Sequence, residues 1–192
     1  NDYVGKGLSG GTIIVRPSAA AAFVAHDNTI IGNTVLYGAT SGKMFAAGQA
    51  GERLCVRNSG ATAVVEGAGT NACEYMTGGR VVILGEVGDN FGAGMTGGMA
   101  FIYDPNETFM KRVNPASLEV MRIGTAHWEG ELESLVETHA AATDSALAAR
   151  LLNEWDVEIG KFWQVVPTEI VARLDMPLSE DGGARADGDS PA

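Results

Sequence analysis

The sequence is poor in the features that mark several large classes of protein. It has two cysteines, which are too few for a disulfide framework or for a zinc site on their own. No stretch approaches the roughly 18 consecutive apolar residues of a membrane-spanning helix, and no basic-then-apolar leader precedes a small-residue cleavage site. These absences favour a reducing compartment without a membrane partner, so we expect a cytoplasmic protein.

Basic residues are also scarce. Thirteen Lys and Arg stand against 24 Asp and Glu, a formal net charge of −11. Residues 1–128 carry ten acidic and nine basic side chains, a net of −1, whereas residues 129–192 carry fourteen and four, a net of −10. No basic stripe is available to hold a phosphate backbone, so we expect no nucleic-acid partner. Two regions of different composition therefore meet near Trp128.

Proline is absent between Pro17 and Pro105, and this span contains a repeat. A Ser-Gly or Thr-Gly dipeptide followed by a strand-like run starts at Ser9, Ser41, Ser59, Thr77 and Thr96, in steps of 32, 18, 18 and 19 residues. Central strands need their N–H groups on both sides, so the lack of proline fits paired strands. A fixed period with one strand per copy predicts a stacked solenoid, because no copy can bury its apolar face alone.

Two apolar columns appear when the five copies are aligned without gaps on the Ser or Thr. Four places on, the residues are Ile13, Phe45, Ala63, Val81 and Ala100, and six places on they are Val15, Ala47, Val65, Ile83 and Ile102. Residues two apart in a strand share a face, so both columns are predicted to point into the coil. The glycines that follow the Ser or Thr are predicted to lie at corners, where a positive φ suits glycine. They are Gly10, Gly42, Gly60, Gly78 and Gly97.

The pattern after the coil changes to a helical period. Leu132, Leu135, Val136 and His139 mark one helix face, with Ser134 and Glu137 spaced as a capping box. Thr143-Asp-Ser offers N-caps for a second helix that runs to Trp155, and Phe162–Pro167 reads as a short extended segment. We expect a parallel β-helix over 1–128, a helical and extended cap over 129–178 at one end of the coil, and a disordered tail over 179–192.

Several strings resemble one known family, the C-terminal domain of the glutamate synthase large (alpha) subunit. They are Arg53–Gly60, Val64–Gly69, Cys73–Gly79 and Asn90–Gly98, supported by Asn1–Gly11, Thr143–Ser145 and Phe162–Pro167. The resemblance extends to about Leu178, and one departure is Asn71, where many relatives carry histidine. It implies an all-β fold class, a single-stranded right-handed parallel β-helix called the GXGXG domain, followed by a pair of helices. The residues that carry its structural motif are Gly60, Gly67, Gly69, Cys73, Glu74, Tyr75, Met76, Thr77, Gly78, Gly79, Gly97 and Gly98.

The resemblance also implies a function. Glutamate synthase converts glutamine, 2-oxoglutarate and a reductant to two glutamates, using an amidotransferase domain and an FMN synthase domain with an iron–sulfur cluster. The β-helix is implied to be a non-catalytic structural domain that holds those two domains in register, with no cofactor of its own. Implied partners are the amidotransferase and FMN synthase domains and the small (beta) subunit. The reductant, whether NADPH, NADH or ferredoxin, is left open because its binding residues lie elsewhere.

Residues that suggest chemistry have a structural interpretation beside the functional one. Gly67-Ala-Gly69 resembles half of a dinucleotide fingerprint, but strands follow it instead of a helix, so a corner turn is favoured. Cys55 and Cys73 are one repeat apart and should stack in one column, after Tyr37 and before Gly92, without enough ligands for a metal. Glu66 and Glu74 are interpreted as surface or interface charges. Ladders of ion pairs with acids are expected for Arg53, Arg57 and Arg80.

Two other functions remain open. The first is an enzyme in its own right, since other β-helices act as polysaccharide lyases or acyltransferases. Lyases usually present clustered acids and bases, and acyltransferase coils need a six-residue period; the sequence shows neither. The second is a freestanding subunit of another oxidoreductase complex, as in the β-helical subunit of formylmethanofuran dehydrogenase. For the structural domain, separation from its neighbours would leave an uncovered end strand at the N-terminal coil, which predicts self-association through the ends of the coil.

Overall fold

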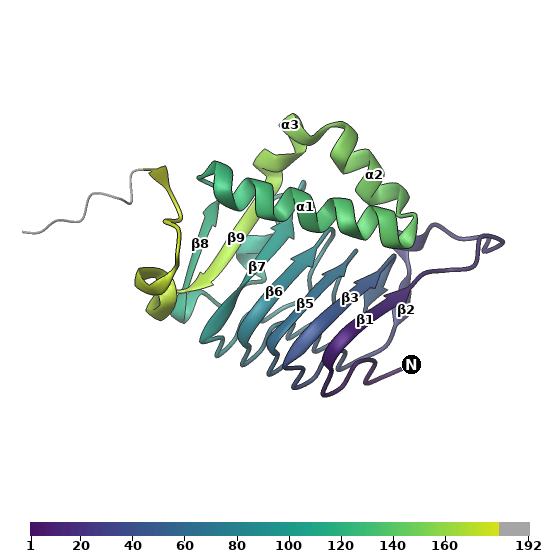
Figure 1. Cartoon of the computed structure of the whole chain (residues 1–192), viewed down its shortest axis with the longest axis horizontal. Helices are drawn as coiled ribbons and strands as arrows, with labels where there is room; N and C mark the ends of the chain where they lie inside the picture. Colours follow the sequence, from purple (N-terminus) through teal and green to yellow (C-terminus); the bar gives the residue numbers. More distant parts are fainter. Residues whose placement is uncertain (181–192) are drawn as a thin grey trace, which may run out of the picture.

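The computed structural model describes residues 1–180, and its body is a β-solenoid (Figure 1). The coil has about four turns, and five strands that follow one another around it lie side by side in a parallel sheet. These strands are β1 (Ser9–Val15), β3 (Ser41–Ala46), β5 (Ser59–Val65), β6 (Thr77–Ile83) and β7 (Gly97–Tyr103). The predicted stacking of the five copies is therefore confirmed.

The register confirms most of the predicted columns. Val65 pairs with Ile83 and Ile83 with Ile102, while Ala63, Val81 and Ala100 line up in the same way. All six are buried in a core cluster inside the coil. Like side chains therefore pile up along the axis, as a solenoid requires.

The gap-free alignment is wrong by one residue in the copy that begins at Ser41. Met44 pairs with Ala63, and Phe45 pairs with Val64. The reason is the corner, where Ser41-Gly-Lys43 spans the distance that takes four residues, Ser9 to Thr12, in the first turn. Met44 and Ala46 therefore lie inside the coil in place of Phe45 and Ala47.

A second, narrower face runs beside the main sheet. The strand β2 (Thr29–Ile31) pairs in parallel with β4 (Gln49–Ala50), and single bridges from Ala50 to Ala68 and from Ala68 to Val87 continue the ladder. The long step between Ser9 and Ser41 therefore holds an additional strand, together with a 3-10 helix, η1 (Ala25–Asp27).

The helices lie along the side of the coil rather than across its end (Figure 1). They are α1 (Ala126–Thr143), α2 (Ala146–Asn153) and α3 (Trp155–Glu158), and α1 begins just before the predicted boundary at residue 128. Leu132 and Val136 of α1 share a buried cluster with Phe45, Val64 and Val82 on the outer face of the main sheet. This second core explains why Phe45 faces outward: the helices cover it.

The end of the coil after β7 is closed by strands. β9 (Phe162–Pro167) pairs antiparallel with β7, and β8 (Leu118–Arg122) pairs antiparallel with β9. Of the predicted cap, only the extended segment closes the end, and the sheet is mixed. The all-β prediction is corrected to a β-solenoid with a layer of helices. Further 3-10 helices are η2 (Phe109–Lys111), η3 (Pro115–Ser117), η4 (Ile159–Lys161) and η5 (Thr168–Arg173).

The helix N-caps agree with the sequence in one case only. Ser145 caps α2 through a hydrogen bond from Ala148 N–H to its hydroxyl, as predicted. α1 is capped by Thr125, and Ser134 lies well inside the helix, so the predicted capping box at Ser134 is wrong. Ser179 forms a bridge with Gly124, and residues 181–192 of the predicted tail lie outside the described residues. Within residues 1–180, no helix is both long and apolar enough to cross a bilayer.

Candidate functional site

The third face of the coil has an unusual backbone, and it carries the Cys73-Glu74-Tyr75 part of the motif. Positive φ recurs at every second residue, at Arg53, Cys55 and Arg57 in one turn and at Asn71, Cys73 and Tyr75 in the next. Such angles cost a non-glycine residue of order 1 kcal/mol or more and persist only where the surroundings impose them.

Hydrogen bonds between turns impose this conformation. The outer two N–H groups, on Arg53 and Arg57, donate forward to the carbonyls of Thr70 and Glu74 at 2.8 and 3.1 Å. The middle N–H, on Cys55, donates back to Val35 at 2.9 Å. Each turn is thereby bonded to both neighbours, so this part of the motif is used in holding turns together.

The two cysteines occupy the middle position of this face. They are fully buried, and Cys73 N–H donates to the carbonyl of Leu54, so the predicted stacking on adjacent turns is confirmed. The residue that precedes Cys55 in the column is Leu36, not Tyr37, because of the one-residue shift in that turn. Burial raises the pKa of Cys55 to about 12, and burial beside Cys55 raises the pKa of Cys73 well above its ordinary value.

We expect both thiols to be inert in the folded protein. A thiol whose pKa is near 12 is almost entirely protonated at pH 8, and the thiolate is the reactive form. A thiol-reactive dye should therefore label neither cysteine at pH 8 until denaturant unfolds the chain. Rapid labelling of Cys55 or Cys73 in the native protein would contradict their burial in this face.

The corner Met76–Gly79 packs against a side chain that the sequence analysis missed, Asn58. The buried amide of Asn58 accepts from Ala61 N–H and donates to the Ala61 carbonyl, both at 2.9 Å. Gly79 has a φ of 95°, and a Cβ there would overlap both the Asn58 amide and the Ala61 carbonyl. An asparagine one residue before the Ser-Gly dipeptide was the available signal, since this residue type commonly bonds to nearby backbone.

Three glycines of the motif are needed for close approach of the backbone. A Cβ at Gly60, Gly78 or Gly97 would lie closer than 3.0 Å to a carbonyl oxygen of the preceding turn, a separation that real Cβ atoms essentially never show. None of the three has a positive φ, so the predicted reason is wrong for them. The positive φ falls on the next glycine where there is one, at Gly79 and Gly98.

Gly67 and Gly69 flank the second face. A Cβ at Gly67 would press on the side chain of Gln49, and one at Gly69 on the backbone of Glu52. Ala68 between them bridges to the turns on both sides. No helix begins here, so a dinucleotide site, which needs a strand, a turn and a helix, has no support.

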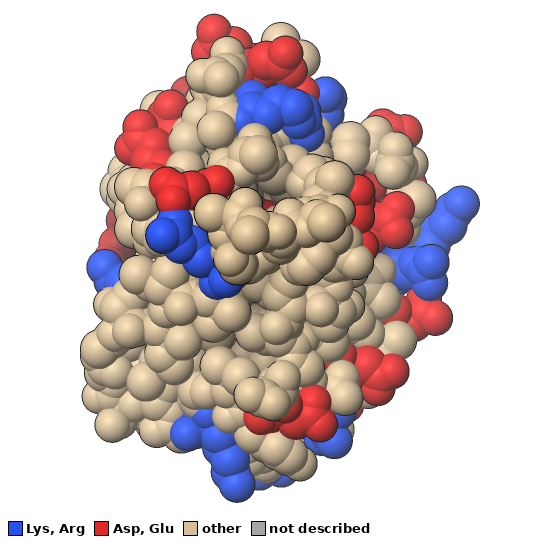
Figure 2. All heavy atoms as spheres, turned by 90° about the vertical axis from the view of Figure 1, so that its right-hand side faces the viewer, with Lys and Arg blue, Asp and Glu red and all other residues tan. Residues whose placement is uncertain are grey.

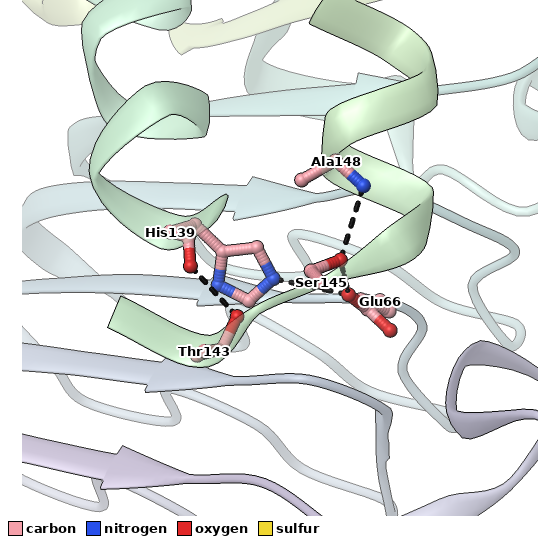
Figure 3. A network of polar contacts seen from close by, with 5 residues as sticks. All are labelled: Glu66, His139, Thr143, Ser145 and Ala148. Carbon is pink, nitrogen blue, oxygen red and sulfur yellow. Dashed lines mark hydrogen bonds and ion pairs between the residues drawn. The ribbon is translucent and has the colours of Figure 1, made fainter. Parts of the chain in front are cut away.

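A buried polar network joins the coil to the helix layer (Figure 3). Glu66, the residue directly after β5, accepts a hydrogen bond from the Ser145 hydroxyl, and its Oε1 lies 3.1 Å from Nε2 of His139. All three side chains are at most 5% exposed. Because buried polar groups are costly without partners, these contacts fix where the turn between α1 and α2 sits on the coil.

This network has the residue types of a serine hydrolase but not its arrangement. In a catalytic triad the imidazole lies between the hydroxyl and the carboxylate, and here the carboxylate lies between the other two (Figure 3). The Ser145 oxygen also accepts from Ala148 N–H at 3.0 Å as a helix cap.

The interpretation of Glu66 as a surface charge is wrong, because its side chain is buried under the helices. Glu74 lies on another face of the coil, so the two carboxylates do not form a pair.

Two acidic side chains anchor the segments that close the coil. Burial alone would raise the pKa of Asp104, but hydrogen bonds from Thr108 and Phe109 N–H and from the Trp163 indole outweigh it and lower the pKa. Burial alone would also raise the pKa of Glu158. Hydrogen bonds from the Tyr103 hydroxyl and from Lys161 outweigh burial and lower that pKa. Burial and the bond to Glu158 raise the pKa of Tyr103.

Replacing Asp104 by asparagine should destabilise the chain by about 1–3 kcal/mol at pH 7, because its donors lose a charged acceptor and at least one N–H then faces an amide NH2 in place of an oxygen. A carboxylate with a lowered pKa stabilises the folded state above its ordinary pKa, and this contribution is lost as pH falls through the folded value. The difference between wild type and Asp104→Asn in urea unfolding should therefore shrink on acidification below about pH 4. Asp89→Asn, which removes an exposed pair with Arg112, should cost less than about 1 kcal/mol. An equal Asp104 effect at pH 7 and pH 3 would contradict the assignment.

The predicted arginine ladders are not formed as expected. Arg80 pairs with Glu131 of α1 and lies 5.7 Å from the Trp128 ring, so it joins the coil to the helix layer. No ion pair of Arg53 or Arg57 is found among residues 1–180. In the same part of the chain, no three His, Cys, Asp or Glu side chains come together as a metal site.

The motif residues therefore do not converge on one pocket. They lie on three faces of the coil and contact the preceding or following turn. What they define is a class of protein: a β-solenoid domain whose glycines allow turns to stack closely. The chain belongs to the GXGXG motif family, which matches residues 1–168.

Curated relatives give the family a context. The chain is 61% identical over 178 residues to the glutamate synthase [NADPH] large chain of Azospirillum brasilense, covering 93% of this chain and 12% of that protein. It is 52% identical over 167 residues to the ferredoxin-dependent glutamate synthase 1, chloroplastic/mitochondrial, of Arabidopsis thaliana, covering 87% and 10%. For the glutamate synthase [NADH] of Schizosaccharomyces pombe the identity is 48% over 185 residues, covering 96% and 9%. The chain thus spans about a tenth of the length of these relatives.

Proposed function

We propose that this chain is the structural β-solenoid domain of a glutamate synthase, which converts glutamine, 2-oxoglutarate and a reductant to two glutamates. Its role is to hold the amidotransferase and FMN synthase domains of the large chain in register, and it takes no direct part in either reaction. Its partners are those two domains and the small (beta) subunit. FMN and the iron–sulfur cluster are bound by other domains.

The observation that carries this proposal is the use of the family motif. Gly60, Gly78 and Gly97 allow close backbone contact between turns, and the positive-φ face is occupied with hydrogen bonds between turns. A solenoid joined in this way is a rigid spacer, because each turn is fixed to both neighbours.

The range of relatives also supports a role apart from electron transfer. Proteins named for NADPH, NADH and ferredoxin all resemble this chain at 48–61% identity. A domain that bound the reductant would be expected to differ among them, because these three donors have different recognition chemistry. A spacer would serve all of them equally.

The experiment uses the full-length large chain carrying Gly97→Ala, which should disrupt the coil. We expect glutamine hydrolysis to continue while glutamate formed per ammonia released falls, because the two catalytic domains lose their relative position. Gly130→Ala, on the exposed side of α1 with no atom near its Cβ, is the matched control and should leave the ratio unchanged. Protease sensitivity of the coil reports whether Gly97→Ala has unfolded it. An unfolded coil with an unchanged ratio would refute the proposal.

Three finer points belong to the same proposal. The coil is right-handed, in line with the strong preference of parallel strand connections. The location is cytoplasmic, although some relatives are named as chloroplastic proteins. Self-association through an uncovered end is expected when the domain is separated from its partners.

A further inference from the structure

The two ends of the coil differ in how they are finished. After β7, the strands β9 and β8 continue the sheet and close that end. At the other end β1 pairs with β3 alone among the described strands, which leaves its outer edge unpaired. An edge of this kind offers a row of free backbone groups to another strand.

Apolar side chains are uncovered at the same end. Ile13 and Val15 belong to the inner columns but stay partly exposed, because no turn lies over them. Ile14, on the side of the helices, is 50% exposed. The loop after β1 adds Phe23 and Val24, which are 49% and 52% exposed. We call this surface the open end and define it by these five residues.

Charged side chains avoid the middle of the open end. Figure 2 views the molecule from this side and shows Lys, Arg, Asp and Glu mainly around the rim of a broad uncharged area. An apolar centre with a polar rim is the usual anatomy of a protein interface, and large exposed apolar patches on a soluble protein commonly mark one.

The polypeptide itself leads to this surface. Asn1 lies in the end turn, where its carbonyl accepts from Gly32 N–H at 2.9 Å, and Tyr3 N–H donates to Asn33 at 2.8 Å. In the large chains that this chain resembles, about nine-tenths of the residues lie outside the matched region. If the chain is the C-terminal domain proposed above, those residues precede Asn1 and connect directly to the open end.

We propose that the open end is the docking surface for a segment of the same large chain that precedes Asn1, which covers Ile14 and Phe23 and pairs with the free edge of β1. This inference rests on the proposed function. Attachment favours this occupant over a second copy, because a linked segment acts at an effective concentration in the millimolar range. At the other end the last turn of the coil is already covered, because β9 pairs with β7 and the outermost strand of the sheet there is the added strand β8.

The test places a photo-cross-linking residue in the full-length large chain, as Ile14→p-benzoylphenylalanine. Ile14 is half exposed, so the exchange should be tolerated by the coil. The matched control is the same exchange at Val157, an apolar residue of the helix α3 that is 66% exposed. We expect an intrachain product joining position 14 to a peptide that precedes Asn1, in about tenfold higher yield than any product from position 157.

Each other outcome overturns the inference. A cross-link from position 14 to a second copy would assign the open end to self-association. A cross-link to a separate protein would assign it to another subunit, and a yield equal to that at position 157 would show that nothing covers it. Failure here is distinct from failure of the proposed function, because the ratio of glutamate formed to ammonia released is measured separately with Gly97→Ala.

Discussion

Gly97→Ala should lower the free energy of unfolding by more than about 3 kcal/mol, enough to unfold a marginally stable domain. The Cβ of alanine would overlap the carbonyl of Thr77 in the preceding turn. That carbonyl is main chain within a ladder of paired strands, so it cannot move aside as a flexible side chain would. Relief requires the separation of two turns, with loss of the hydrogen bonds between them.

Gly130→Ala is the matched control for this substitution. Gly130 is in α1 with no neighbour within 4 Å of a Cβ, so alanine should stabilise the chain by about 0.5–1 kcal/mol through helix propensity. Urea unfolding of the two variants measures the difference. A Gly97→Ala chain within about 1 kcal/mol of wild type would show that the turns are not in close contact at this column.

Glu66→Ala should destabilise the chain by about 3 kcal/mol or more, because it leaves His139 and Ser145 buried without their common acceptor and opens a cavity. The loss should be largest where the helices meet the coil. Hydrogen exchange should therefore speed up more in α1 and α2 than in β5 and β6, since the network joins these two layers.

Two further variants keep this prediction decisive even if Glu66→Ala fails to fold. Glu66→Gln retains the shape and one acceptor, so it should cost about 1–3 kcal/mol. Glu137→Ala removes an exposed carboxylate of α1, the helix that carries His139, and should change stability by less than about 0.5 kcal/mol. If the amides of α1 exchange hydrogen at the same rate in Glu66→Gln as in the wild type, the network does not hold the helix layer.

The repeat could be predicted from the sequence because it is a local, periodic signal. Val65 and Ile83 lie side by side as the period of 18 requires. The phase of the copy at Ser41 was wrong because Ser-Gly-Lys and Ser-Gly-Gly-Thr differ by one residue at a corner. Apolar residues on both sides of Phe45 concealed the shift, since Met44 and Ala46 suit an inner column equally well.

The helix layer and the polar network could not be predicted in the same way. Both sides of the main sheet are covered, so its strands read as continuous apolar runs that do not reveal which face meets a helix. Glu66 and His139 are 73 residues apart, and no periodic signal links a coil residue to a helix residue. The positive-φ face was hidden for another reason: Arg53, Cys55 and Tyr75 are not residue types that favour that backbone conformation.

The most direct test is a crystal structure of the large chain that contains this region, inspected at the turn that starts at Ser41. The account predicts Met44 stacked between Ile13 and Ala63 inside the coil, with Phe45 outside against α1. Electron density with Phe45 inside the coil, or with Val65 and Ile83 on opposite sides of the sheet, would contradict the stacking on which the structural role depends.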